Sequence, residues 1–579
     1  MFFTLEIIYS ARMSLAGLLT RFLDSDIFSP GPPQDLIFCS FVVSLLVGVL
    51  APTFAATTPV PLLLSLGVTG LCYFAFVVRR GAVLEGVFGG LFALSTFSAE
   101  VPVIQGVRSN DLEILLVDPV LLAALVILAI LYSSGRVQRP TRLTLLPFLF
   151  GAFVGWTGVS ALVGNGPSQS VAVFFSIGRA RMLALLLGVF AITTIYGFRD
   201  VMLAFLPPLA VHVAVALAEG LHGAAFGFTV LGDKTGDLIA NKTLFGLSYS
   251  TGLFPGGFIG TSRALLAVLF LLAPVTAVIL ADRFEGKKRW WSFTLVPTTI
   301  ILVFADTASG LGAFVFLLVI IMIFEVLMRF RSDGADSSLA ATGVSLLSGL
   351  TFITIGQFSK DQTETSFADS SSDGSTSRQT PSAGSTEQEA TPTPNGTTDG
   401  QDATPTPNGT TDGQDATPTQ TELGFTDLLP SFVVENLQIR IWLVFTAVEV
   451  ALNYPVFGLG GANFQLLTRE LGLEFGLTAH NTFLSVLVEF GFPGFFLFMS
   501  AVGYTYYATI GLAWKQPVRR EMWLMILAGL ISFHAFNFWV SLYYSTTVYA
   551  IFWMVAAAVA GEYATTCTQI FDSDVSESG

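Results

Sequence analysis

The sequence predicts an all-α fold, a polytopic integral membrane bundle of about fourteen transmembrane helices, each near the roughly 20 residues that span a bilayer. Of the 579 residues, 53% are hydrophobic and only 12% are charged. Soluble domains carry about 25% charged residues, and this chain also has a positive mean hydropathy. The 53 phenylalanines exceed what a soluble core would bury. Composition therefore places the chain among membrane proteins.

Apolar runs of spanning length follow one another along most of the chain. Polar loops separate them, so we expect each run to form one membrane-spanning helix. The runs cover residues 36–56, 59–78, 82–104, 117–134, 143–163, 172–196, 201–219, 262–282, 291–306, 308–328, 338–356, 493–512, 521–541 and 543–562.

The charges in the loops support this number of helices and orient them. Basic connections, such as Arg79–Arg80 and Lys515 to Arg520, alternate with neutral or acidic ones along the whole chain. Loops rich in Lys and Arg stay in the cytoplasm. We therefore expect a multi-pass protein of the cell (plasma) membrane, with a cytoplasmic N-terminus, a cytoplasmic C-terminus and acidic loops on the outer face.

A long polar segment interrupts the apolar pattern. It is rich in Ser, Thr, Gly, Asp and Pro, and the stretch ATPTPNGTTDGQD occurs twice in tandem from Ala390 to Asp415. Such a segment has too little apolar surface to offset the entropy of ordering, so we predict a disordered loop. The expected parts are an N-terminal transmembrane bundle at 1–356, the acidic Thr/Pro-rich outer loop at 357–436, an extracytoplasmic amphipathic and re-entrant segment at 437–492, C-terminal transmembrane helices at 493–562 and an acidic cytoplasmic tail at 563–579.

Residues that can carry chemistry gather directly after this loop. An amphipathic helix with Arg440 leads into a Gly-rich turn at 453–464, and a polar segment ends at His480. Asn481 is placed to cap the next apolar helix, which we expect to break at 491–494. A helix broken at membrane depth is tolerated only beside protein or a polar cavity. The sequence therefore predicts an outward-facing cavity with a guanidinium and an imidazole at its edge.

This stretch resembles the O-antigen ligase and polymerase family of lipid-linked glycan transferases. The family pattern runs from an Arg-x-x-x-Trp-like helix, through N-P-x-x-G-x-G-x-x-N-F, to H-N-x-x-L and a G-x-x-G step. The residues at comparable positions are Arg440, Asn453, Pro455, Gly458, Gly460, Asn463, Phe464, His480, Asn481 and Leu484.

The resemblance implies a GT-C-like glycosyltransferase architecture and a reaction on the outer face. A glycan would pass from a polyprenyl (dolichol-type) diphosphate carrier to a hydroxyl of a glycan or lipid acceptor, with inversion and with no metal or cofactor. The net charge of −14 argues against nucleic acid as a partner. Excess acid with few lysines is typical of proteins exposed to high salt, as in halophilic archaea.

The implied chemistry suggests roles for particular side chains. Guanidinium groups stabilise a leaving diphosphate bidentately, and a neutral imidazole can take the acceptor proton. We predict that His480 and Arg440 are catalytic. Arg263, in Ser262-Arg263-Ala264, would replace the Arg of the family's S-R-G-A step, which the stretch 307–313 lacks. The residues predicted to bind substrate are Arg263, Arg179, Arg181, Asn481, Asn463 and Gly460.

Other interpretations stay open at this point. His480 could be an ordinary helix-capping residue, and Arg440 a residue that reaches to the interface. Arg179 and Arg181 either lie deep in their helix or sit at the interface, if that helix begins later. A transporter or flippase would suit the same helix count, and a membrane scaffold would make the polar loop the working part. A transporter more often shows paired broken helices in two repeats, and we find one broken segment.

Overall fold

The computed structural model divides the chain into two compact units, residues 1–360 with 439–579, and residues 361–438; the transmembrane bundle belongs to the first. The residues that the structure describes are 30–54, 59–97, 100–104, 112–115, 117–135, 137, 144–222, 240–244, 247–251, 261–283, 297–302, 308–329, 431–471, 478–542 and 545–577.

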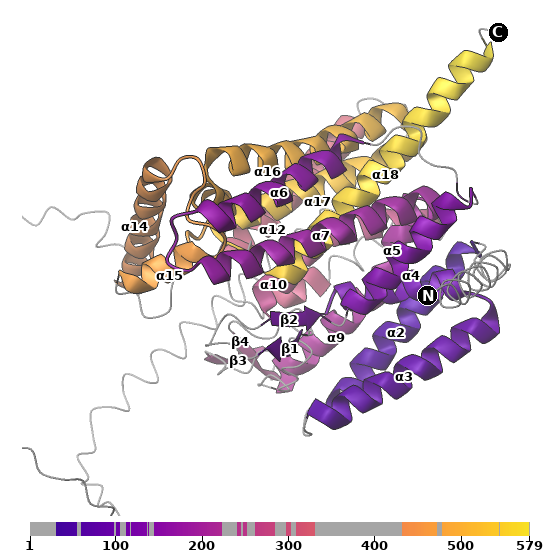
Figure 1. Cartoon of the computed structure of the whole chain (residues 1–579), viewed down its shortest axis with the longest axis horizontal. Helices are drawn as coiled ribbons and strands as arrows, with labels where there is room; N and C mark the ends of the chain where they lie inside the picture. The colour runs from indigo at the N-terminus through magenta and orange to yellow at the C-terminus, as the bar shows by residue number, and fades with distance from the viewer. Residues whose placement is uncertain are drawn as a thin grey trace, which may run out of the picture. The chain divides into compact units, whose positions relative to one another are not determined.

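Most of these residues are helical (Figure 1). The N-terminal helices are α2 (Pro33–Phe54), α3 (Pro59–Arg80), α4 (Val83–Ser95), α5 (Val117–Ser133), α6 (Leu145–Val163), α7 (Gln169–Tyr196), α8 (Phe198–Ala204), α9 (Leu206–His222), α10 (Ser262–Arg283) and α12 (Ala308–Arg329). The C-terminal helices are α14 (Ser431–Asn453), α15 (Asn463–Glu470), α16 (Thr482–Lys515), the 3-10 turn η6 (Pro517–Arg519), α17 (Arg520–Trp539) and α18 (Thr546–Glu577).

The predicted polytopic helical membrane fold is confirmed. In the described part of the chain, seven helical segments are long and apolar enough to cross a membrane, and four shorter apolar helices add to them. Almost every predicted span coincides with a helix. The predicted span at 338–356, most of the span at 291–306 and nearly all of the polar loop at 357–436 lie outside the described residues.

The prediction of one helix over 82–104 is wrong. Helix α4 ends at Ser95, and β1 (Glu100–Ile104) pairs with β2 (Leu112–Leu115) as an antiparallel hairpin. The hydroxyl of Thr96 donates to the Ala93 carbonyl at 2.8 Å and takes up an acceptor at the helix end. A second hairpin, β3 (Ala240–Leu244) with β4 (Leu247–Thr251), lies in the predicted outer loop before α10.

Three other boundaries differ from expectation. The predicted span at 201–219 is divided into α8 and α9 at Phe205, directly before Pro207 and Pro208, which have no N–H to continue a helix. Helix α14 begins at Ser431, inside the predicted polar loop. Helix α18 continues to Glu577 through the predicted tail, because no glycine or proline interrupts residues 563–577.

Close helix packing depends on small residues and aromatic rings. A Cβ on Gly529 of α17 would lie 2.5 Å from the Leu271 carbonyl of α10, so these two helices touch through their backbones. Aromatic rings fill the space where α6, α16 and α18 meet, with Phe150 and Trp553 only 4.1 Å apart between centroids. The core of the bundle thus fixes α17 against α10 and α16.

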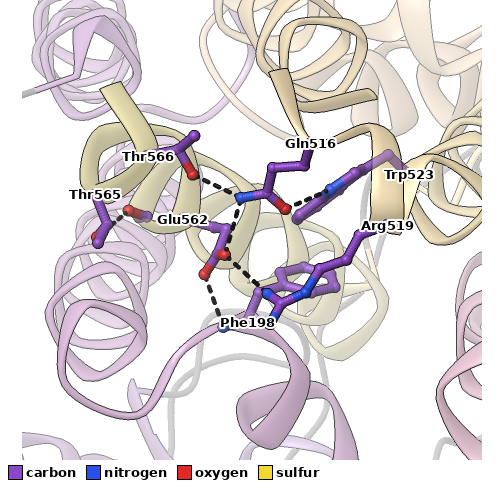
Figure 2. Close-up of polar contacts among 8 residues, drawn as sticks. Phe198, Gln516, Arg519, Trp523, Glu562, Thr565 and Thr566 are labelled. Atoms are coloured by element: carbon purple, nitrogen blue, oxygen red, sulfur yellow. Dashed lines mark hydrogen bonds and ion pairs between the residues drawn. The ribbon is translucent and has the colours of Figure 1, made fainter. Parts of the chain in front are cut away.

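A polar cluster joins α18 to the start of α8 and to the connection between α16 and α17 (Figure 2). The Glu562 carboxylate on α18 accepts from the Phe198 N–H at 3.1 Å and forms a 3.5 Å ion pair with Arg519. It also accepts from Gln516 Nε2 at 3.3 Å, and the Gln516 carbonyl accepts from Trp523 Nε1 at 3.0 Å. One carboxylate therefore joins α18 to the α7–α8 junction and to the α16–α17 connection.

Candidate functional site

The helix break predicted after His480 is present in α16. Gly491 has φ 65° and ψ −175°, values outside the helical region, and Pro493 has no N–H to donate. The carbonyls of Val488 and Glu489 therefore lose their partners within the helix. A buried carbonyl without a partner is costly, so these groups require donors from elsewhere in the fold.

The Gly-rich turn after α14 supplies those donors. Two backbone N–H groups of the turn donate to the two carbonyls. A carbonyl of the turn accepts from a backbone N–H that the break leaves without a partner in the helix. The three hydrogen bonds are Leu459 N to the Val488 carbonyl (3.0 Å), Gly460 N to the Glu489 carbonyl (2.8 Å) and Phe492 N to the Pro455 carbonyl (2.8 Å).

The glycines of the motif permit this approach. Gly458 and Gly460 have φ values of 65° and 81°, in the left-handed region that favours glycine. A Cβ on Gly458 would lie 2.5 Å from the Glu489 carbonyl oxygen, and one on Gly491 would lie 2.3 Å from the Val456 oxygen. The turn and the break therefore fit only with glycine at these positions.

Helix α6 braces the same junction from the other side. The Ser160 hydroxyl lies within hydrogen-bond distance of the carbonyls of Phe457 (2.5 Å) and Glu489 (3.1 Å). Trp156 Nε1 donates to the Phe490 carbonyl at 2.9 Å, and its ring stacks on Phe457 with centroids 5.3 Å apart. No motif or spacing in the sequence assigns these two α6 residues to the site.

Asn463 joins the turn to the start of α7. Its Oδ1 accepts from the Ser168 N–H at 2.9 Å, and its Nδ2 donates to the Leu459 carbonyl at 3.0 Å. The side chain is buried, and both of its polar atoms contact backbone. Asn463 and Gly460 are thus brought together in the structure, where their polar groups hold the turn in place.

Asn481 caps α16 as the sequence predicts. Its Oδ1 accepts from the backbone N–H groups of Phe483 (2.9 Å) and Leu484 (3.1 Å). His480 comes directly before this cap and has φ 48°, which is unusual for a residue other than glycine. Strained backbone of this kind persists where the surrounding structure fixes it, and it concentrates at functional sites.

His480, Arg440 and Arg263 converge at this end of the bundle. Burial, together with the positive charges of Arg440 and Arg263, lowers the pKa of His480 to about 4. His480 lies in the segment before α16, Arg440 on α14 and Arg263 at the start of α10. At neutral pH the imidazole is therefore uncharged and lies near two guanidinium groups.

The two guanidinium groups retain N–H donors that can bind a ligand. Arg263 Nε is buried without a hydrogen-bond partner among the described residues. Arg440 Nη1 donates to the Trp539 carbonyl at 3.4 Å. Neither residue forms an ion pair with another residue that the structure describes. Two like charges held close together favour binding of an anion.

The other two predicted arginines lie within the helices. Arg181 Nε forms a 2.8 Å ion pair with Asp118 Oδ1 of α5. Arg179 is buried, with its guanidinium 4.2 Å above the Phe175 ring and its Nη1 3.0 Å from Met182 Sδ. Because α7 begins at Gln169, earlier than the predicted 172, both arginines lie well inside the helix, and the alternative that this helix begins later is wrong.

Metal ligands do not gather at the described residues. No group of three or more His, Cys, Asp or Glu side chains in the described ranges could hold a metal ion.

Comparison with known proteins supports the reading of this region. Residues 253–499 match a family model described as O-antigen ligase. This range includes Arg263, Arg440, the Gly-rich turn and His480. Comparison with curated proteins and with solved structures gives no match. The resemblance found in the sequence is confirmed over this range: residues 253–499 of a multi-pass membrane protein match the O-antigen ligase family model.

Proposed function

We propose that His480, Arg440 and Arg263 form the active site of an inverting glycan transfer on the outer membrane face. The donor is a glycan on a polyprenyl diphosphate, of the dolichol type in an archaeon. The acceptor is a hydroxyl of a glycan or lipid, and the reaction proceeds without a metal or cofactor. The observation that carries the proposal is the convergence of two guanidinium groups on an uncharged imidazole within the O-antigen ligase domain.

The guanidinium groups suit the leaving group. As the bond from the sugar C1 to the diphosphate oxygen breaks, negative charge grows on that oxygen. Arg440 and Arg263 can each donate two parallel hydrogen bonds to phosphate oxygens, which a lysine could not do. Their mutual repulsion is relieved when the dianion binds, so donor binding is favoured over the unoccupied state.

His480 suits the acceptor. Its lowered pKa keeps the imidazole neutral at physiological pH, and the imidazole can accept the proton of the attacking hydroxyl. The acceptor oxygen bonds to C1 opposite the leaving diphosphate, its proton moves to His480, and the lipid diphosphate departs with the bonding electrons. The configuration at C1 is inverted in this single displacement.

We infer that the remaining motif residues shape the pocket. Asn463, Gly460 and Asn481 have their polar groups on backbone atoms, so they contribute to substrate binding by holding the turn and the cap in position. Arg179 and Arg181 lie deeper in α7, and their predicted contact with the lipid diphosphate remains a prediction.

Substitution of the two proposed catalytic residues tests this function. His480→Ala and Arg440→Ala should each abolish transfer from a purified lipid-diphosphate glycan to acceptor, while the protein still inserts into membranes. His222→Ala, at an exposed histidine at the end of α9, is the matched control and should keep wild-type transfer. Wild-type transfer by His480→Ala would remove the catalytic assignment.

A further inference from the structure

All three elements that carry the proposed catalytic groups contact one helix, α17. It packs against α10, which carries Arg263, and against α16, which follows His480 (Figure 1). The contact with α10 is a close one, because Gly529 lets the two backbones meet and Phe536 packs edge-on against Phe270 at 5.5 Å. The end of α17 is therefore fixed relative to the helix of Arg263.

Asn537 ties the end of α17 to the start of α16. Its Nδ2 donates to the Phe533 carbonyl at 2.8 Å, and only the NH2 group can make this bond, so the orientation of the amide is set. Asn537 Oδ1 is thereby presented to Thr482, whose hydroxyl donates to it at 3.1 Å. Asn537 and Thr482 are both fully buried, and Thr482 lies two residues after His480.

The same turn of α17 also holds Arg440. Trp539 is the last residue of α17, and its carbonyl is one of those that a helix end leaves without an intrahelical partner. This carbonyl accepts from Arg440 Nη1 at 3.4 Å, at the end of the helix where the dipole favours a cation. A second contact, between the hydroxyls of Ser541 and Ser485 at 3.2 Å, joins the segment after α17 to α16.

We propose that the end of α17 and the two residues after it, residues 537–541, are the positioning element that sets the placement of the His480 imidazole relative to the Arg440 and Arg263 guanidinium groups. Asn537 acts through Thr482, and the Trp539 carbonyl acts on Arg440 directly. Arg440 and Trp539 are 99 positions apart in the chain, so one turn of α17 positions groups from distant parts of the sequence. The proposal rests on the function proposed above, since it explains how the three catalytic groups of that site are held in position.

Thr482→Val tests the proposal, because it keeps the shape of the side chain and removes the donor to Asn537. In the full-length protein in lipid nanodiscs, we expect kcat for glycan transfer to fall about 10- to 100-fold, as small misplacements of catalytic groups do. Thr482→Ser, which keeps the hydroxyl, should restore wild-type kcat. The matched control is Thr505→Val on the same helix, since that buried hydroxyl donates to the Ala501 carbonyl within α16.

A second readout requires no activity. Diethyl pyrocarbonate reacts with an imidazole in its neutral form, so the pH dependence of modification at His480, located by mass spectrometry, reports the titration of that imidazole. The midpoint should lie near 4 in the wild type, where burial and the positive charges of Arg440 and Arg263 lower the pKa, and it should rise in Thr482→Val, because the displaced imidazole is then less buried and farther from both charges. Thr505→Val should leave the midpoint unchanged.

The two readouts separate the possible failures. If Thr482→Val does not insert, Asn537→Leu removes the same hydrogen bond from the other side and should give the same changes. Unchanged kcat and an unchanged His480 midpoint in the inserted variant would overturn the positioning role. Wild-type transfer by His480→Ala would instead overturn the proposed function, and the shift of the midpoint in Thr482→Val would still support the role of α17 in placing the imidazole.

Discussion

The backbone N–H of Gly460 donates to the carbonyl of Glu489 at 2.8 Å, and this bond joins a loop motif to a broken helix. The motif that carries the family resemblance is thus a structural unit, in which a Gly-rich turn supplies the hydrogen bonds that a helix break requires. His480 and Asn481 lie at the start of the same broken helix. The unit therefore places the proposed catalytic histidine at the same end of α16 as the Gly-rich turn.

Alanine at the break should destabilise the protein. In Gly491→Ala, the left-handed backbone costs about 1–2 kcal/mol, and the Cβ would lie 2.3 Å from the Val456 carbonyl oxygen. We expect a lower midpoint of thermal unfolding in detergent and loss of transfer. Gly503→Ala, on the same helix with nothing within 4 Å of the new Cβ, should unfold at or above the wild-type temperature. Equal midpoints for the two variants would contradict the account of the break.

The pH dependence of transfer should report His480. The imidazole acts as a base only when unprotonated, so kcat/KM should rise with pH through about 4 and then level off. Because the diphosphate charge offsets Arg440 and Arg263, donor binding should raise the pKa, and kcat should level off at a higher pH than kcat/KM. Steady-state rates from pH 3.5 to 8 measure both curves. Coincident inflections would argue against a diphosphate near the imidazole.

The Arg181–Asp118 ion pair should contribute to stability. Both side chains are largely shielded from solvent, so Arg181→Gln leaves a partly buried carboxylate without its partner and should cost about 1–3 kcal/mol of unfolding free energy. The double variant Arg181→Gln with Asp118→Asn should recover part of that loss. Chemical denaturation in detergent measures the cycle. Full additivity of the two single effects would show that the pair is not coupled, and a raised KM for donor would favour direct contact of Arg181 with the diphosphate.

The Glu562 cluster should hold the far end of the bundle without taking part in transfer. Glu562→Gln removes the charge that faces Arg519 and the Phe198 N–H, and should lower the unfolding free energy by about 1–2 kcal/mol. Transfer per folded molecule should stay at the wild-type level. Glu449→Gln, at an exposed glutamate of α14, serves as the control for removal of a carboxylate. A large loss of kcat in Glu562→Gln would indicate coupling between this end and the site.

Periodicity and loop charge were sufficient to predict the helical membrane fold, because a spanning helix has a length and composition that the bilayer dictates. The same logic failed at 82–104, where an apolar run continues beyond Ser95 as a hairpin strand and hydropathy does not distinguish the two. Asn481 could be recognised as a cap because capping is a local effect. Asn463 belongs to a sequence motif that can be recognised, yet its contact with Ser168 is long-range, so only the fold reveals it. The contribution of α17 left no local signal, because Asn537 and Trp539 act through a side-chain contact and a backbone carbonyl.

The central claim is that Arg263 and Arg440 together bind a lipid-linked diphosphate beside His480, and donor affinity in nanodiscs tests it most directly. Arg263→Ala and Arg440→Ala should each weaken binding of a polyprenyl-diphosphate glycan about 10- to 100-fold, as expected for loss of charge-assisted hydrogen bonds. Arg80→Ala, at an exposed arginine of α3 paired with Asp35, should bind like the wild type. Wild-type affinity in both Arg263→Ala and Arg440→Ala would contradict the account.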